Sequence, residues 1–181
     1  NLRRSGRVPE KIKAQLRIDP ALTAIKPGDP DSPLLTKRRE YRLLEQSGRQ
    51  YLQPVVYGAW QEIPAGATNA VWPVRVSDGF TRVGVQLHAQ QGAEITNPVI
   101  TLGEQRWTWS GTLTNGQFLF FWPGEPTTRH RAGLQPPERG PLAPATTLSP
   151  GEHEAAFMIR NPRETPYRVR FTFQGGERVE L

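Results

Sequence analysis

Three tryptophans placed next to predicted turns are the residues of this sequence best suited to contact a ligand. Trp60 and Trp72 flank the turn sequence EIPAGA, and Trp122 ends an apolar run beside Pro123-Gly124. An indole ring is wide and rigid, so the apolar face of a sugar ring can stack on it. Strand ends and loops often carry the binding residues of a β scaffold. We therefore predict ligand contacts at these three tryptophans, with burial in the core as the alternative for each.

Four further side chains near these predicted turns and strands complete the candidate site. Tyr57 precedes the first turn and offers another aromatic ring. Gln61, Asn69 and His88 carry groups that can hydrogen-bond to sugar hydroxyls. The predicted carbohydrate-binding site is therefore Trp60, Trp72, Trp122, Tyr57, His88, Gln61 and Asn69.

No spacing of residues in the sequence is typical of a catalytic site. His88, His130 and His153 lack the spacing of paired zinc ligands, and GxSxG, GxxxxGK[ST] and GxGxxG are all absent. Glu152 and Glu154 lie two residues apart on a predicted strand and share a face, as a pair of hydrolytic carboxylates would. A solvated strand face is the interpretation we favour for this pair, and whether the chain belongs to an enzyme stays open.

A metal site has little support in the sequence. There is no cysteine, which excludes a thiolate site and any disulfide. Asp78, Glu94 and Asn97 are the only loop oxygens that we consider for a structural calcium ion, and no Asp-rich loop accompanies them. We expect no cofactor and leave the metal content unknown.

The elements that would position these residues are short strands separated by turns. Residues 80–90 and 167–173 alternate apolar and polar side chains, which is typical of strands with one buried face. Asn115-Gly116 lies between two apolar runs and predicts a tight hairpin turn. We place Trp107, Trp109, Phe118 and Phe120, on the strands beside this turn, in the core. Residues 124–150 are rich in proline and are interpreted mostly as a loop. The pattern predicts an all-β fold, an antiparallel β-sandwich of jelly-roll-like form.

The positive charge is concentrated at the N-terminal end. Residues 1–50 hold 12 Lys and Arg against 6 Asp and Glu, whereas residues 51–181 hold 11 of each. We interpret residues 1–50 as an extended basic segment, either a linker or the tail of a preceding domain, with a strand at 11–18 and a short helix at 34–46. Residues 51–181 would be the sandwich domain. The neutral body argues against nucleic acid as a partner, and no apolar run approaches the ~20 residues of a membrane span.

Several stretches together resemble a known family of accessory domains. They are EIPAG, NPVITLGEQRWTWSGTLTNGQFLFF, LSPGEHEAAF and YRVRFTF, in that order. Over residues 55–175 this order resembles the C-terminal β-sandwich of large secreted bacterial glycoside hydrolases, which is similar to carbohydrate-binding modules of the galactose-binding-like kind. The long proline-rich stretch at 124–150 departs from that pattern.

The resemblance implies a non-catalytic accessory module that follows the catalytic domain of a secreted polysaccharide-degrading enzyme. Its partners would be a polysaccharide or oligosaccharide, and a catalytic domain or chain contacted through residues 1–50. The location would be secreted or periplasmic, and no membrane partner is expected.

Two alternatives stay open beside carbohydrate binding. The sandwich could have a purely structural role, stabilising a catalytic partner, or it could be an assembly module such as a virion or tail component. Aromatic exposure separates these readings. A binding module requires at least two solvated aromatic side chains close together, whereas a structural module buries its aromatic residues.

Overall fold

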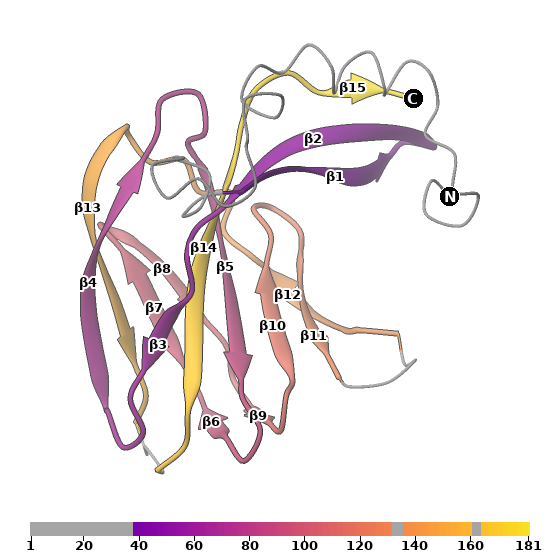
Figure 1. The fold of residues 1–181 in the computed structure, drawn as a ribbon. Helices are drawn as coiled ribbons and strands as arrows, with labels where there is room; N and C mark the ends of the chain where they lie inside the picture. Colours follow the sequence, from indigo (N-terminus) through magenta and orange to yellow (C-terminus); the bar gives the residue numbers. More distant parts are fainter. Residues whose placement is uncertain (1–37, 132–135, 161–163) are drawn as a thin grey trace, which may run out of the picture.

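The chain folds into antiparallel β-sheets that enclose one main hydrophobic core (Figure 1). The structure is a computed structural model. It describes residues 38–131, 136–160 and 164–181. The predicted strand at 11–18, and the interpretation of residues 1–37 as a linker or tail, lie outside the described residues. The predicted all-β, antiparallel fold class is confirmed over the described part.

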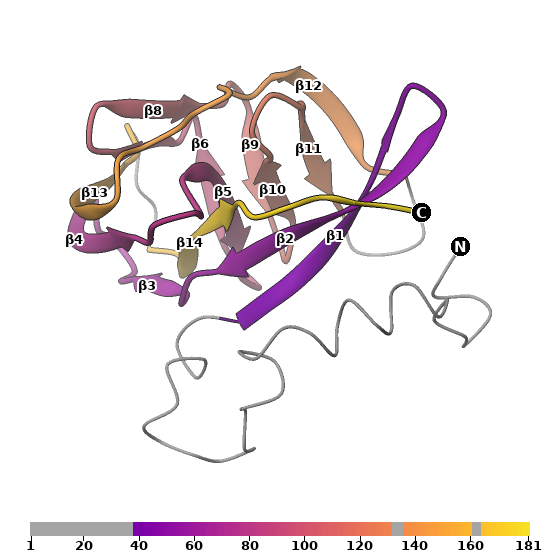
Figure 2. The ribbon, with the colours of Figure 1, turned by 90° about the horizontal axis from the view of Figure 1, so that it is seen from above.

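The largest sheet has nine strands and curls into a half-barrel. Its strands follow the order β1-β2-β14-β5-β10-β11-β12, with β15 paired to β2 and β3 paired to β14. The bounds are β1 (Arg38–Gln46), β2 (Arg49–Tyr57), β3 (Gln61–Ile63), β5 (Arg82–Ala89), β10 (Phe118–Phe121), β11 (Pro126–His130), β12 (Glu138–Leu142), β14 (Tyr167–Gln174) and β15 (Val179–Glu180). Seen from above, the sheet turns from β14 through β10 toward β11 and β12 (Figure 2).

A four-stranded sheet packs against the inner face of this large sheet. Its order is β4-β13-β7-β8. A separate pair, β6 with β9, lies at one end. The bounds are β4 (Asn69–Val76), β6 (Glu94–Thr96), β7 (Val99–Leu102), β8 (Gln105–Thr108), β9 (Thr112–Thr114) and β13 (Gly151–Met158).

The core forms because alternate side chains of the two central strands point inward, as the sequence predicts. These are Val83, Val85 and Leu87 of β5 and Tyr167, Val169, Phe171 and Phe173 of β14. They meet residues of the smaller sheet that include Phe157 and Trp107, the latter only 1% exposed. The prediction that Trp107 lies in the core is therefore confirmed, and Trp109 is half-buried against the same cluster. The remaining side chains of β5 and β14 point to the other face of the large sheet.

Residues 38–46 form a strand, so the prediction of a short helix at 34–46 is wrong over that part. The strand pairs along its length with β2, and Gln46 faces Arg49 across a two-residue turn. Ser47 and Gly48 both have positive φ, 52° and 72°, as tight hairpin turns require. The hairpin spans the composition break at residue 50, so residues 38–50 belong to the large sheet. In Figure 1 it extends beyond the sandwich, beside β15.

The Asn115-Gly116 turn is present, but the hairpin predicted around it is not. Both residues have positive φ, 41° and 78°. The preceding strand β9 pairs with β6, whereas β10 pairs with β5 and β11, so the turn carries the chain from one sheet to another. Hydrogen bonds from Asn115 N to Ala93 O and from Gly116 N to Ala89 O stabilise this crossing.

The proline-rich stretch contains two strands that the sequence reading missed. β11 and β12 pair with a bulge between Pro126 and Thr128, and β12 is the exposed edge of the sheet. Proline is tolerated at edges and bulges because no ladder hydrogen bond is lost there. The prolines therefore fit the edge of the curled sheet and do not break it.

Candidate ligand-binding face

The outer face of the large sheet carries aromatic and arginine side chains in place of ordinary solvated residues. Cross-strand pairing places Arg168, His88, Phe118 and His130 in one row and Arg170, Gln86, Phe120 and Thr128 in the next. Tyr57, Trp60 and Trp122 border these rows. We call this set the aromatic–arginine face; its members are Tyr57, Trp60, Gln86, His88, Phe118, Phe120, Trp122, Thr128, His130, Arg168 and Arg170.

Trp60 lies under two guanidinium groups. The guanidinium carbons of Arg168 and Arg170 are 4.5 Å and 4.3 Å from the centre of its ring system, and Arg170 is also 4.6 Å from the ring of Tyr57. Both aromatic side chains are half-buried. A guanidinium above an aromatic ring is attracted by the ring's negative face. This contact therefore fixes where the arginine donors lie.

The same two arginines also donate hydrogen bonds to neutral acceptors on the neighbouring strand β5. Arg168 Nε donates to His88 Nδ1 at 2.9 Å, and Arg170 Nε donates to Gln86 Oε1 at 2.7 Å. His88 also stacks on Phe118, with ring centres 4.0 Å apart and an interplanar angle of 1°. Since His88 Nδ1 accepts a hydrogen bond, its ring is neutral in this arrangement.

The electrostatics of the face favour neutral histidines. Burial lowers the pKa of His88 from its ordinary value, the positive charge of Arg168 lowers it further, and Glu62 opposes the shift. Burial alone lowers the pKa of His130. His130 Nε2 is 2.9 Å from Thr128 Oγ1, and its ring centre is 4.4 Å from that of Phe120.

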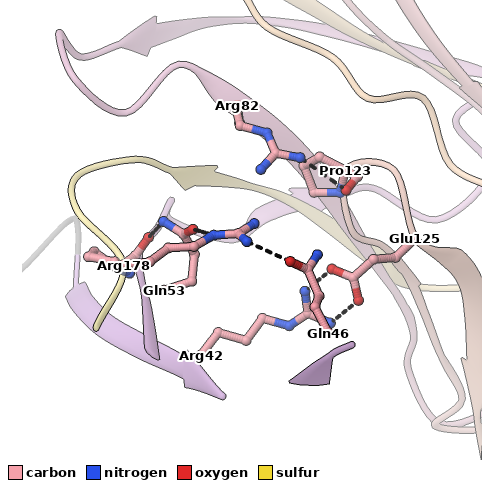
Figure 3. Close-up of polar contacts among 8 residues, drawn as sticks. Arg42, Gln46, Gln53, Arg82, Pro123, Glu125 and Arg178 are labelled. Carbon is pink, nitrogen blue, oxygen red and sulfur yellow. Dashed lines mark hydrogen bonds and ion pairs between the residues drawn. The ribbon is translucent and has the colours of Figure 1, made fainter. Parts of the chain in front are cut away.

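Trp122 connects this face to the β1–β2 hairpin. It is only 8% exposed, and Tyr57 packs edge-on against it with ring centres 6.2 Å apart. The guanidinium carbon of Arg42 in β1 lies 3.9 Å from the centre of the indole. Arg42 also pairs through two hydrogen bonds with Glu125, which follows Trp122 in the β10–β11 turn (Figure 3). Trp122 is thus clamped between sheet and hairpin.

Gly84 gives the outer face the room that this packing needs. A Cβ at this position would lie 2.5 Å from both the backbone oxygen of Phe121 and Oγ1 of Thr172. Any side chain here would therefore force the central strands apart or displace Thr172. The absence of a side chain at Gly84 keeps β5, β10 and β14 close together beside Trp122.

Trp72 and Gln61 are not on this face but at its border, beside a cavity of about 230 Å³. Trp60 lines the same cavity. Trp72 belongs to β4 of the smaller sheet and packs against the core residue Phe171, with ring centres 6.2 Å apart. Gln61 Nε2 donates to the backbone oxygen of its neighbour Glu62. The two predicted site residues therefore share this cavity with Trp60.

Asn69 and the considered calcium ligands lie apart from the aromatic–arginine face. Asn69 is exposed at the start of β4 and pairs with Met158. Asp78 lies in the β4–β5 turn and Glu94 in β6, while Asn97 Oδ1 accepts a hydrogen bond from the backbone of Gly111. Among the residues that the structure describes, no group of three or more His, Cys, Asp or Glu side chains is arranged to hold a metal ion.

The structure thus groups Tyr57, Trp60, His88 and Trp122, and adds residues that the sequence reading did not include in the site. The prediction that Phe118 and Phe120 are core residues is wrong, because both lie on the outer face and are half-buried. Arg168 and Arg170 are polar positions of the alternating stretch 167–173, and the sequence analysis did not include them in the site. One signal was available, since residues 118–122 are apolar at both odd and even positions, as a strand covered on both faces would be.

Comparison with protein-family models and with curated proteins finds no match. What the fold defines is an all-β protein with several antiparallel sheets, one of them curled into a half-barrel. Within the described ranges, no helix has the length and apolar character needed to cross a membrane.

Proposed function

We propose that this chain is a non-catalytic carbohydrate-binding module and that the aromatic–arginine face is its binding surface. The observation that supports this most strongly is the position of the aromatic rings. Tyr57, Trp60, Phe118 and Phe120 are half-buried on a sheet face that does not contribute to the sandwich core. Partly solvated aromatic side chains gathered on one surface are what a sugar-stacking site requires.

The arginines complement the rings on this surface. A guanidinium held over an aromatic ring still carries N–H groups that can donate to hydroxyl oxygens. In Arg168, Nε is bonded to His88, and no described residue accepts a hydrogen bond from its terminal nitrogens, which can donate to a ligand. A sugar on this face would meet apolar ring edges and fixed hydrogen-bond donors together.

The wider context rests on the sequence resemblance. Within this proposal the module accompanies the catalytic domain of a secreted or periplasmic polysaccharide-degrading enzyme. The module either holds polysaccharide near the catalytic domain or stabilises that domain. Residues 1–50 contact the catalytic domain. The chain itself supplies no catalytic residue in this proposal.

Affinity measurements on single variants test the proposed site. The full chain would be titrated with a panel of soluble polysaccharides by calorimetry, and Trp60→Ala compared with Trp72→Ala. Both tryptophans are half-buried and line the same cavity, but only Trp60 lies on the face. We expect Kd to rise at least tenfold for Trp60→Ala, and to change less than threefold for Trp72→Ala. Equal losses would move the site to the shared cavity.

A purely structural role is the second candidate, and the mutual packing of the rings favours it. His88 stacks on Phe118, Phe120 on His130, and Arg42 on Trp122. Such contacts stabilise a sheet without any ligand. If no polysaccharide binds to a protein that melts cooperatively, this second function replaces the first.

A further inference from the structure

A cleft of about 240 Å³ lies between the β1–β2 hairpin, the β10–β11 turn and the segment after β14. Its lining includes three arginines, Arg42, Arg82 and Arg178, and the amide of Gln174. Two carboxylates, Glu45 and Glu125, also line it. The volume falls below the roughly 300–1,000 Å³ of typical small-molecule sites. The cleft is therefore suited to a single chemical group or sugar unit of a larger ligand.

Neutral groups hold Arg178 in the cleft. Its Nε donates to Gln53 Oε1 and one terminal nitrogen donates to Gln46 Oε1, both at 2.8 Å (Figure 3). Gln53 is 4% exposed, and its own amide nitrogen donates to Gly175 O at 2.8 Å. The guanidinium is thus fixed in position by a buried amide, while its positive charge is not neutralised by these partners.

Arg82 is held in a similar way, and Arg42 differs. Arg82 donates to the backbone oxygen of Pro123 at 3.5 Å, which is a neutral acceptor. Arg42 is paired with Glu125, so that pair contributes little net charge. Among the described residues that line the cleft, the two positive charges of Arg82 and Arg178 therefore exceed the one negative charge of the remaining carboxylate, Glu45.

Gln174 adds an unsatisfied donor to this cleft. Its side chain is 2% exposed, and its amide nitrogen has no hydrogen-bond partner among the described residues. A buried donor without a partner costs about 1–3 kcal/mol. An acceptor oxygen brought into the cleft would face arginine donors, and contact with the Gln174 amide nitrogen would in addition remove this cost.

The cleft adjoins the aromatic–arginine face at Arg42. This residue lines the cleft and also lies over Trp122, which packs against Tyr57 and Phe120. A chain of sugar units lying across the face would therefore reach the cleft at the hairpin. Guanidinium groups bind carboxylate and sulfate oxygens through paired hydrogen bonds.

We propose that the polysaccharide held by this module is anionic, and that one of its carboxylate or sulfate groups enters the cleft between Arg82 and Arg178. This inference rests on the proposed carbohydrate-binding function and specifies the ligand class. The shared chemistry is a negatively charged oxygen group on a sugar unit. Carboxylate and sulfate are separated by the experiment.

The experiment uses two sets of polymers, and within each set the members share one backbone and differ in charge. The full chain would be titrated with dextran, carboxymethyl-dextran and dextran sulfate, and with polygalacturonate and its methyl ester. We expect the charged member of at least one set to bind at least tenfold more tightly than its neutral counterpart. The charged polymer that shows this gain, carboxymethyl-dextran or polygalacturonate on one side and dextran sulfate on the other, identifies carboxylate or sulfate.

Arginine variants then test the cleft itself. Arg178→Gln and Arg82→Gln should each weaken binding of the charged polymer at least tenfold and leave neutral polymers unchanged. Arg106→Gln is the matched control. It removes the same charge, but from an exposed position on β8 of the smaller sheet. It should change Kd less than twofold. Arg178→Lys keeps the charge but not the fork of donors, and serves if Arg178→Gln does not melt cooperatively.

Each of the other outcomes contradicts one part of the proposal. Equal affinity for charged and neutral polymers would overturn the anionic ligand and leave carbohydrate binding intact. Equal losses for Arg178→Gln and Arg106→Gln would show non-specific attraction to a basic protein and overturn the cleft. Single-stranded DNA that binds with the same dependence on Arg178 would replace polysaccharide by nucleic acid. Absence of binding to every polymer would instead contradict the proposed function.

Discussion

Replacing Gly175 by alanine should destabilise the protein strongly, because two backbone segments meet there without room for a side chain. An added Cβ would lie 2.6 Å from the carbonyl carbon of Gly79 and 2.7 Å from the Cα of Phe80. It would lie even closer to the carbonyl oxygen of Gly79. All these atoms are backbone, so no side-chain rotation relieves the overlap. The hydrogen bond from Gly176 N to Gly79 O, at 3.1 Å, holds the segments together.

The expected cost is at the upper end of that for overpacking, about 3 kcal/mol. At ~2–4 °C per kcal/mol for a domain of this size, Tm should fall by roughly 6–12 °C. Thermal unfolding followed by circular dichroism measures this. Gly140→Ala is the control, since its Cβ would be 3.7 Å from the nearest atom, the oxygen of Thr127. It should leave Tm unchanged or raise it. A Gly175→Ala protein within about 1 kcal/mol of the parent would refute the close backbone approach.

Three further outcomes are expected. Trp107→Ala should cost about 3–5 kcal/mol in urea unfolding, and Trp107→Phe clearly less, because phenylalanine also removes an indole N–H that has no partner among the described residues. The lowered pKa of His88 means that its neutral form stabilises the fold, so the free energy of unfolding should be highest above pH 6.5 and fall as pH drops through the lowered pKa. His88→Gln, which retains an acceptor, should reduce that fall in chemical unfolding measured across pH; an unchanged slope would count against it. A double-mutant cycle on Arg42→Met and Glu125→Gln should give a coupling free energy of about 0.5–1 kcal/mol, because water screens the partly exposed carboxylate. A coupling of zero would show that this ion pair does not stabilise the contact between the hairpin and the sheet.

Sequence patterns predicted the inner face of the large sheet well and its outer face poorly. Alternation over residues 80–90 and 167–173 identifies the inward side chains, because a single buried face imposes a period of two. At residues 118–122 apolar side chains occupy both faces, so periodicity cannot separate core from surface. Only the pairing with β5 and β11 shows that Phe118 and Phe120 lie outside.

In the β1–β2 hairpin, local propensity did not predict the strand. Residues 38–46 include good helix formers, but their strand state is set by pairing with β2 and by the Ser47-Gly48 turn. Pairing of distant segments overrides weak intrinsic preference. The arginine cleft depends on such pairing too, since Arg42, Arg82 and Arg178 approach one another only when β1, β5 and the segment after β14 are assembled. The sequence offered no spacing that would have indicated it.

The central position of β14 has a consequence for the order in which the protein can fold. This strand lies between β2 and β5 and is synthesised after both. Until residue 174 has left the ribosome, β2 and β5 have no partner between them, and the inner faces of both remain without the aromatic side chains of β14. Closure of sequence-distant strands is slow. The large sheet should therefore form only after β14 has been synthesised, with β5 exposed as an aggregation-prone edge until then.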